Sequence, residues 1–228
     1  MRFRAAAIGL LSGVVGLVGC ANGSPSVSEQ EGRVRYVALG DSYTIGTSVP
    51  EAERWPNQLA ERIVPLDLVG NPAVNGFTSA DLINEELPKL DGLRPELVTV
   101  LIGVNDVVQG VSDLQYAGNV AIILEELRTR LPAERIFCVA TPDYTLTPLG
   151  ASFGDPVQQG DAIVRFNAIL REACETRGMR FVPEIFEISQ MARDDPSLVA
   201  SDGLHPSGAQ YRLWVEAIEP VVVQLLDQ

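Results

Sequence analysis

Apolar runs alternate with amphipathic stretches along most of the chain, which predicts strands that alternate with helices. Short apolar or β-branched runs predict strands at residues 34–39, 66–69, 97–102, 135–140 and 180–183. Helical spacing and capping residues predict helices at residues 55–64, 79–87, 112–131, 161–177 and 208–226. The segment 141–160 is rich in Pro and Gly and is predicted to be a long functional loop.

This order of elements predicts a parallel sheet between two layers of helices, because right-handed crossovers place the connecting helices on its faces. The expected fold class is α/β: a three-layer α/β/α sandwich around a five-stranded parallel sheet in the flavodoxin-like order 2-1-3-4-5. The unbroken apolar run at 97–102 suits a central strand that is covered on both faces. No linker interrupts residues 33–228, which are predicted to form one domain.

Residues 1–19 differ in composition from the rest of the chain. Arg2 and Arg4 are followed by an uncharged, mostly apolar stretch, which is typical of a secretory signal peptide. The stretch ends in Leu17-Val18-Gly19-Cys20, which resembles the lipobox of bacterial lipoproteins; an ordinary signal peptide with a chance cysteine is the alternative. We expect a lipidated Cys20, a flexible tether at 20–32, and an extracytoplasmic protein anchored to the membrane of the cell envelope, or secreted if not lipidated.

The net charge limits the classes of binding partner, and the cysteine and histidine content limits the metal sites that the chain could form. The formal net charge of −13 makes nucleic acid and other polyanions poor partners and favours neutral substrates. Cys138 and Cys174 are expected to be buried free thiols, although an exported protein would permit a disulfide. The sequence has no Cys-x-x-Cys and no cluster of histidines, so we expect neither a metal site nor a cofactor.

A candidate nucleophile follows the first predicted strand, in Gly40-Asp41-Ser42. The carboxyl end of a parallel strand opens on the crevice where such folds bind ligands. His205 is the single histidine of the chain, and Asp202 precedes it by three residues. That spacing allows the carboxylate to orient the imidazole toward Ser42, as in a Ser-His-Asp triad. The alternatives are a plain turn at Ser42 and a loop histidine beside a turn aspartate.

Acyl transfer also needs hydrogen-bond donors for the developing oxyanion. Three candidates lie at strand or turn ends: the backbone N–H of Ser42, the backbone of Gly76, and the side-chain amide of Asn105. Gly76 could instead be a simple turn glycine, and Asn105 could instead cap a helix.

Four short blocks taken together resemble the SGNH (GDSL-like) hydrolases. These are Gly40-Asp41-Ser42, an Asn-Gly pair ending at Gly76, Gly103-x-Asn105-Asp106 and Asp202-x-x-His205, in the order of that family. The resemblance covers the chain from about residue 34 to its C-terminus. It implies a metal-free esterase in which Ser42 is the nucleophile, Asp202 and His205 complete the triad, and Ser42, Gly76 and Asn105 form the oxyanion hole. Tyr43 stands where the namesake motif has leucine, at a position without a chemical role.

The function predicted from these residues is hydrolysis of short-chain acyl esters, with a small molecule or an acylated glycan as substrate. Few apolar residues occur in the segment 141–160, so the cleft should be shallow and should favour short acyl groups. A lysophospholipase, lipase or thioesterase acting on longer chains is an alternative, as is a non-catalytic surface binding protein on the same fold. A metal-dependent phosphohydrolase using Asp41, Asn105, Asp106 and His205 is a third possibility.

Overall fold

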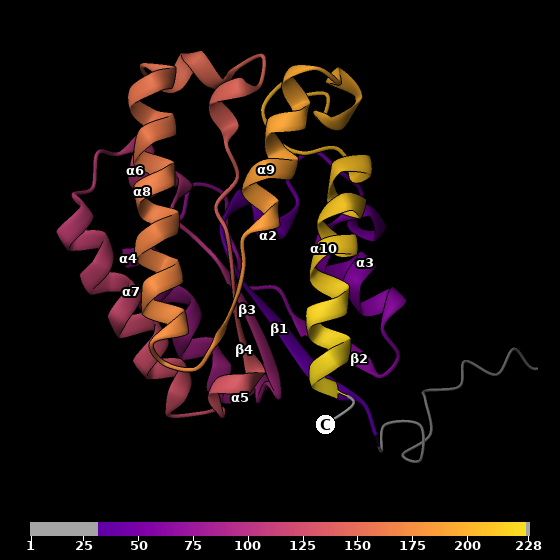
Figure 1. Cartoon of the computed structure of the whole chain (residues 1–228). Coiled ribbons are helices and arrows are strands. Elements are labelled where there is room, and N and C mark those ends of the chain that lie inside the picture. The colour runs from indigo at the N-terminus through magenta and orange to yellow at the C-terminus, as the bar shows by residue number, and fades with distance from the viewer. Residues whose placement is uncertain (1–31, 227–228) are drawn as a thin grey trace, which may run out of the picture. The chain divides into compact units, whose positions relative to one another are not determined.

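The computed structural model describes residues 32–226 (Figure 1). The expected signal peptide at residues 1–19, Cys20 and nearly all of the expected tether lie outside the described residues. Among the helices of residues 32–226, none is both long and apolar enough to cross a membrane.

Five parallel strands form the central sheet, as the sequence predicted. They are β1 (Val34–Gly40), β2 (Leu66–Gly70), β3 (Leu97–Leu101), β4 (Ile136–Val139) and β5 (Arg180–Val182). Their order is β2-β1-β3-β4-β5, which confirms the predicted topology. Gly40 pairs with Leu101, so β1 and β3 end at the same level and their following loops start side by side. Strand β3 is buried along its whole length.

Helices cover both faces of the sheet (Figure 1). Helix α3 (Trp55–Arg62) packs against α10 (Gly208–Leu226) on one face, and α7 (Asp113–Arg128) packs against α8 (Pro156–Glu175) on the other. The α/β/α sandwich is therefore confirmed. Large side chains from both layers, including Trp55, Trp214 and Phe166, are almost fully buried against the strands.

The predicted helix at residues 79–87 is broken into several short pieces. Helix α4 (Ser79–Asp81) begins with a capping box, in which the Thr78 hydroxyl accepts from the Asp81 N–H and the Asp81 carboxylate accepts from the Thr78 N–H. A π-helical segment (Leu82–Glu86), a 3₁₀ turn (Leu87–Lys89) and α5 (Leu90–Leu93) follow. Pro88 has no N–H to donate, which interrupts the regular α-helical hydrogen bonding here.

The predicted loop at residues 141–160 is shorter than expected. Helix α8 begins at Pro156, where Asp155 accepts hydrogen bonds from two backbone N–H groups of the first turn. The prediction was wrong because Gly160 reads as a loop residue, yet it lies inside the first turns of α8. The remaining loop contains 3₁₀ turns at Tyr144–Leu146 and Gly150–Phe153. Four short helices were not predicted, namely α2 (Ser42–Ile45), α5, α6 (Val104–Val108) and α9 (Glu184–Gln190).

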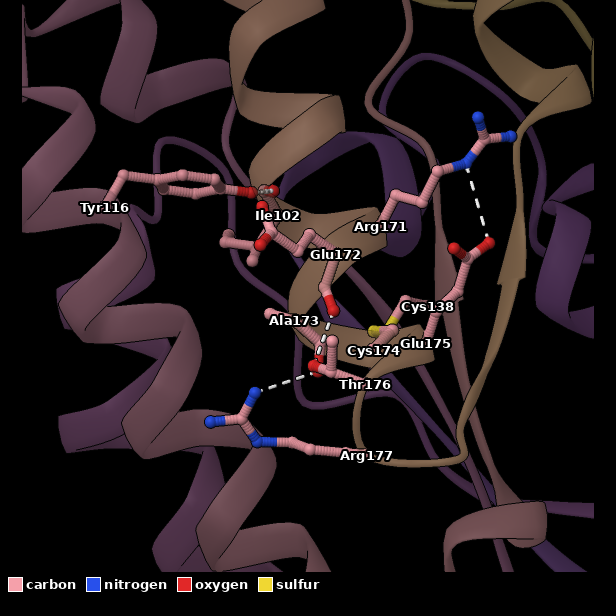
Figure 2. Close-up of a disulfide and its surroundings, with 10 residues drawn as sticks. All are labelled: Ile102, Tyr116, Cys138, Arg171, Glu172, Ala173, Cys174, Glu175, Thr176 and Arg177. Carbon is pink, nitrogen blue, oxygen red and sulfur yellow. Dashed lines mark hydrogen bonds and ion pairs between the residues drawn. A yellow bond between two sulfur atoms is a disulfide. The ribbon is translucent and has the colours of Figure 1, made fainter.

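Cys138 and Cys174 form a disulfide, so the expectation of two free thiols was wrong (Figure 2). Cys138 lies in β4 and Cys174 in the last turn of α8, with their Cα atoms 6.6 Å apart and both side chains fully buried. The pattern of apolar positions showed that both residues are buried. It could not show that this turn of α8 lies directly over the middle of β4.

Candidate active site

The candidate nucleophile lies at a sharp turn between β1 and the short helix α2 (Ser42–Ile45). Gly40 has φ +155°, and a Cβ there would clash with the Leu101 carbonyl oxygen and the Thr44 side chain, so only glycine fits. Asp41 caps the helix by accepting a hydrogen bond from the Tyr43 N–H at 3.0 Å. Ser42 is thereby fixed as the first residue of α2, at the carboxyl edge of the sheet.

Asp202 and His205 are held together in a loop before α10. The carboxylate oxygen Oδ2 of Asp202 lies 2.6 Å from Nδ1 of His205. The other oxygen, Oδ1, accepts hydrogen bonds from the backbone N–H groups of Leu204 and His205 at 2.9 and 3.0 Å. Both carboxylate oxygens are thus engaged, and the imidazole ring is oriented by its Nδ1 contact.

The environment of Asp202 favours its ionised form. Burial alone would raise the pKa of this carboxyl, but hydrogen bonds from Ser48, His205 and Leu204 outweigh burial and hold the pKa well below its ordinary value. Asp202 is therefore a carboxylate over the whole neutral range. Such a group can stabilise a positive charge on the imidazole of His205.

One cavity of about 150 Å³ brings the sequence-predicted residues together. Ser42, His205, Gly76 and Asn105 all line it. Ser42 and Asn105 lie in the short helices α2 and α6, which follow β1 and β3, whereas Gly76 lies in the loop after β2 and His205 in the loop before α10. The contacts of the described residues include no hydrogen bond between the Ser42 hydroxyl and the His205 ring. The rest of the wall is mainly apolar and is formed by Asn75 and by Tyr43, Val104, Val108, Tyr144, Phe153 and Leu204.

The three candidate oxyanion donors, Ser42, Gly76 and Asn105, all line this cavity. Gly76 has φ +84°, a conformation that favours glycine, in a turn closed by the Phe77 N–H and the Val74 carbonyl. Within the described residues, the backbone N–H groups of Ser42 and Gly76 have no hydrogen-bond acceptor. The Asn105 amide nitrogen donates to the Phe77 carbonyl at 2.9 Å and makes a longer contact of 3.5 Å with Oδ2 of Asp41, and these contacts orient its side chain at the cavity wall.

Three buried carboxyl groups surround the nucleophile turn without lining the cavity. Asp41 and Glu86 are fully buried, and burial raises their pKa values to about 7 and about 8. Burial also raises the pKa of Asp106, which accepts hydrogen bonds from the Ser79 backbone and hydroxyl. Within residues 32–226, no group of three or more His, Cys, Asp or Glu side chains is placed to hold a metal ion. These carboxyl groups accept hydrogen bonds from the turns around the site and do not line the cavity.

Sequence reasoning missed three of the residues that support the site. Glu86 binds the Gly40 N–H, Ser48 binds Asp202, and Thr47 binds Asn75, next to Gly76. Ordinary Ser, Thr and Glu residues without a motif carry no local signal for these roles. Their contacts join segments that are between 28 and 154 residues apart in the chain.

Comparison with known families identifies the family of this chain. The model of the GDSL-like lipase/acylhydrolase family matches residues 38–213, which include all four blocks of site residues. The chain belongs to this family. It is therefore a member of the SGNH, or GDSL, esterases, which are carboxylic ester hydrolases. No curated protein matches the sequence.

Solved structures share the fold at low sequence identity. TesA is 20% identical, with a TM-score of 0.64 over 83% of this chain and 98% of that chain. The psychrotrophic esterase EstA from Pseudoalteromonas, solved with monoethylphosphonate as inhibitor, is 15% identical, with a TM-score of 0.65 over 85% and 100%. Axe2, an acetylxylan esterase from Geobacillus stearothermophilus, is 17% identical, with a TM-score of 0.62 over 85% and 94%. At these identities the likeness shows the fold alone.

Proposed function

We propose that this member of the family hydrolyses short-chain acyl esters with Ser42 as nucleophile, His205 as general base and acid, and Asp202 as the group that orients His205. The observation that carries the proposal is one small apolar cavity lined by both Ser42 and the single histidine, whose Nδ1 lies 2.6 Å from Asp202. A binding protein would have no need for this set of groups around one cavity.

The proposed reaction proceeds through an acyl-enzyme. The Ser42 oxygen attacks the ester carbonyl carbon while Nε2 of His205 takes the hydroxyl proton, and the carbonyl electrons move onto the oxygen. The N–H groups of Ser42, Gly76 and Asn105 bind that oxyanion. Collapse of the intermediate expels the alcohol, which receives the proton from His205. Water, activated by His205, then repeats the sequence and releases the carboxylic acid and free Ser42.

The cavity size supports a short acyl group. A volume of about 150 Å³ is enough for a molecule of the size of benzene. An acyl chain from acetyl to about hexanoyl therefore fits, and each further methylene would remain in water and gain little binding energy. Phe153 and Tyr144, whose rings meet edge to face with centroids 6.1 Å apart, form one end of the wall.

We favour a carbohydrate as the alcohol component of the ester, so that the substrate is an acylated carbohydrate. Support comes from the acetylxylan esterase Axe2, which shares the fold and whose substrate carries short acyl groups on a sugar chain. The net charge of −13 also favours a neutral partner over a phosphate-rich one. Longer acyl chains, as in lysophospholipids or thioesters, are the competing substrates that the experiment below must separate.

We also propose that the protein is exported and held at the membrane by lipidated Cys20. The lipobox-like string ending at Cys20 motivates this location. The buried disulfide between Cys138 and Cys174 supports it, because such bonds persist in oxidising compartments outside the cytoplasm.

A chain-length series of p-nitrophenyl esters from C2 to C16 tests the proposed function with the purified domain. We expect kcat/KM to be highest between C2 and about C6 and to fall at longer chains. The matched Ser42→Ala variant should fold normally and lose turnover, because a cavity-wall hydroxyl is removed without opening the core. A kcat/KM that rises steadily to C12 would favour the long-chain alternative. Undiminished turnover in Ser42→Ala would end the assignment of the nucleophile.

A further inference from the structure

Residues 46–48 connect three parts of the active site that are far apart in the sequence. The Ser42 carbonyl accepts hydrogen bonds from the N–H groups of Gly46 and Thr47, at 3.1 and 3.0 Å. The segment therefore begins on the backbone of the nucleophile itself. The two hydroxyl groups that follow, on Thr47 and Ser48, each donate a hydrogen bond of 2.6 Å to a different site loop.

The Ser48 hydroxyl binds the carboxylate of Asp202. It donates to Oδ2, the same oxygen that lies 2.6 Å from Nδ1 of His205. With the two backbone N–H groups on Oδ1, this bond completes the set of donors around the carboxylate. The hydroxyl fixes Asp202 from the side of the nucleophile turn, 154 residues away in the sequence.

The backbone of Ser48 is held in an unfavourable conformation to make this contact. Its φ is +67°, in the left-handed region that residues with a Cβ seldom adopt. Such a conformation is strained and persists only where the surrounding contacts enforce it. Ser48 is exposed, so core packing of its own side chain does not enforce it. The bond to Asp202, the contacts of Thr47 and the packing of Val49 against the core all act on this part of the backbone.

Thr47 makes the corresponding contact on the oxyanion side. Its hydroxyl donates to the side-chain oxygen of Asn75, the residue directly before Gly76. One short segment thus ties the nucleophile turn to the Gly76 turn and to the Asp202 loop. A small displacement of any of these three parts would separate groups that must act on one carbonyl.

We propose that Ser48 is a positioning residue for catalysis, which holds the Asp202 carboxylate against His205 in register with the nucleophile turn, and that Thr47 does the same for the oxyanion turn. This inference rests on the triad proposed above. Ser48 does not touch the reacting atoms. It acts through Asp202, so its loss should affect kcat far more than KM.

Three substitutions at Ser48 separate the hydroxyl from the backbone. Ser48→Ala removes the donor and keeps the strained backbone. Ser48→Gly removes the donor and relieves the strain. Ser48→Asn restores an N–H donor in a residue that tolerates the left-handed region. Ser197→Ala is the matched control, because the Ser197 hydroxyl also donates at 2.6 Å to a carboxylate, Asp195, in an exposed loop that does not line the cavity.

The measurement is kcat, KM and the pH profile of kcat/KM on p-nitrophenyl acetate, with unfolding midpoints for every variant. We expect about a tenfold fall in kcat for both Ser48→Ala and Ser48→Gly, the effect of one hydrogen bond to a charged group, with KM nearly unchanged. The acid limb of the profile should move to higher pH, because a carboxylate with fewer donors holds the proton of the neighbouring imidazolium more strongly. Ser48→Asn should recover most of kcat, and Ser197→Ala should match the wild type.

Wild-type kcat and pH profile in Ser48→Ala would overturn the proposal. A defect in Ser48→Ala that Ser48→Gly repairs would also overturn it, since backbone strain would then be the cause. An equal loss in Ser48→Asn would do so as well. Ser42→Ala in the same series tests the triad itself. If that variant keeps turnover, the triad assignment is wrong, and the proposed role of Ser48 is then wrong as well.

Discussion

Asn105 is the proposed oxyanion donor that a side-chain substitution can remove without moving the backbone. The Asn105 amide is fixed by its 2.9 Å hydrogen bond to the Phe77 carbonyl, so it is oriented before the substrate arrives. We predict that Asn105→Ala lowers kcat by about 10²–10³ and changes KM little, because a preorganised donor acts mainly on the transition state. Steady-state kinetics on a short ester measure this split.

Asn84→Ala is the control for that variant, since Asn84 is exposed and does not line the cavity. It should leave kcat unchanged. A wild-type kcat in Asn105→Ala would instead assign Asn105 to the support of the Phe77 turn alone.

Glu86 makes the stability of the nucleophile turn depend on pH. Its Oε2 accepts the Gly40 N–H at 3.0 Å, whereas Oε1 is buried and has no hydrogen-bond partner within the described residues. Burial, and next the charge of Asp41, raise the pKa of Glu86 from 4.5 to about 8. The folded protein therefore holds this proton at pH values where the unfolded chain has lost it. The contribution to stability is present below about pH 4.5 and is lost as pH rises through about 8.

We predict that Glu86→Gln becomes more stable relative to the wild type as pH rises between about 5 and 8. Gln retains an oxygen for the Gly40 N–H but does not ionise. The difference in free energy of unfolding should grow by up to about 1.4 kcal/mol per pH unit. Urea denaturation of both proteins at several pH values measures it. If the Gln amide itself destabilises the protein, it lowers the free energy of unfolding by the same amount at every pH. The change with pH is therefore the test, and a difference between the two proteins that is independent of pH would contradict the prediction.

The residues that could be predicted from the sequence are those whose chemistry or backbone demands a particular residue type. His205 is the single histidine, and a turn such as the one at Gly76 needs a positive φ. Ser48 and Glu86 could not be predicted in the same way. Their roles arise only when the fold brings Asp202 and Gly40 to them, and other donors or acceptors would serve at those positions.

At the scale of elements, strands could be predicted more accurately than helix ends. A buried parallel strand such as β3 is an unbroken apolar run, which leaves a clear pattern. The start of α8 at Pro156 depends on the cap at Asp155, and the preceding Pro and Gly residues hide it. The pairing of Cys138 with Cys174 depends on how α8 lies across β4, which no local pattern contains.

The disulfide ties helix α8 to the sheet (Figure 2). A bridge across a sequence separation of 36 residues typically adds about 2–4 kcal/mol to the free energy of unfolding. We predict a loss of this size in the double variant Cys138→Ala/Cys174→Ala, with kcat close to that of the wild type, because neither cysteine lines the active cavity. Urea denaturation with and without reductant measures the loss. A wild-type protein that is equally stable with and without reductant would contradict the prediction.

At the scale of the whole molecule, the acidic charge and the proposed lipid anchor have opposite effects on binding to a membrane. A net charge of −13 disfavours adsorption to anionic lipid headgroups, so lasting attachment to a membrane needs a covalent anchor. A single acyl chain holds weakly, whereas two or more hold firmly, at about 0.8 kcal/mol per buried CH₂. We therefore predict that the wild type stays in the membrane fraction after a high-salt wash and that Cys20→Ser does not.

Cell fractionation with mass spectrometry of the N-terminal peptide checks this prediction. The wild type should begin at a lipid-modified Cys20, and the Cys20→Ser protein should carry no lipid. Because Cys20 lies outside the predicted domain at residues 33–228, kcat/KM on a water-soluble ester should be the same in both proteins. On an ester embedded in vesicles, only the anchored form should show a higher kcat/KM, since its anchor raises the local concentration of substrate. An unmodified Cys20 in the membrane-bound wild type would reject the anchor while leaving the esterase assignment intact.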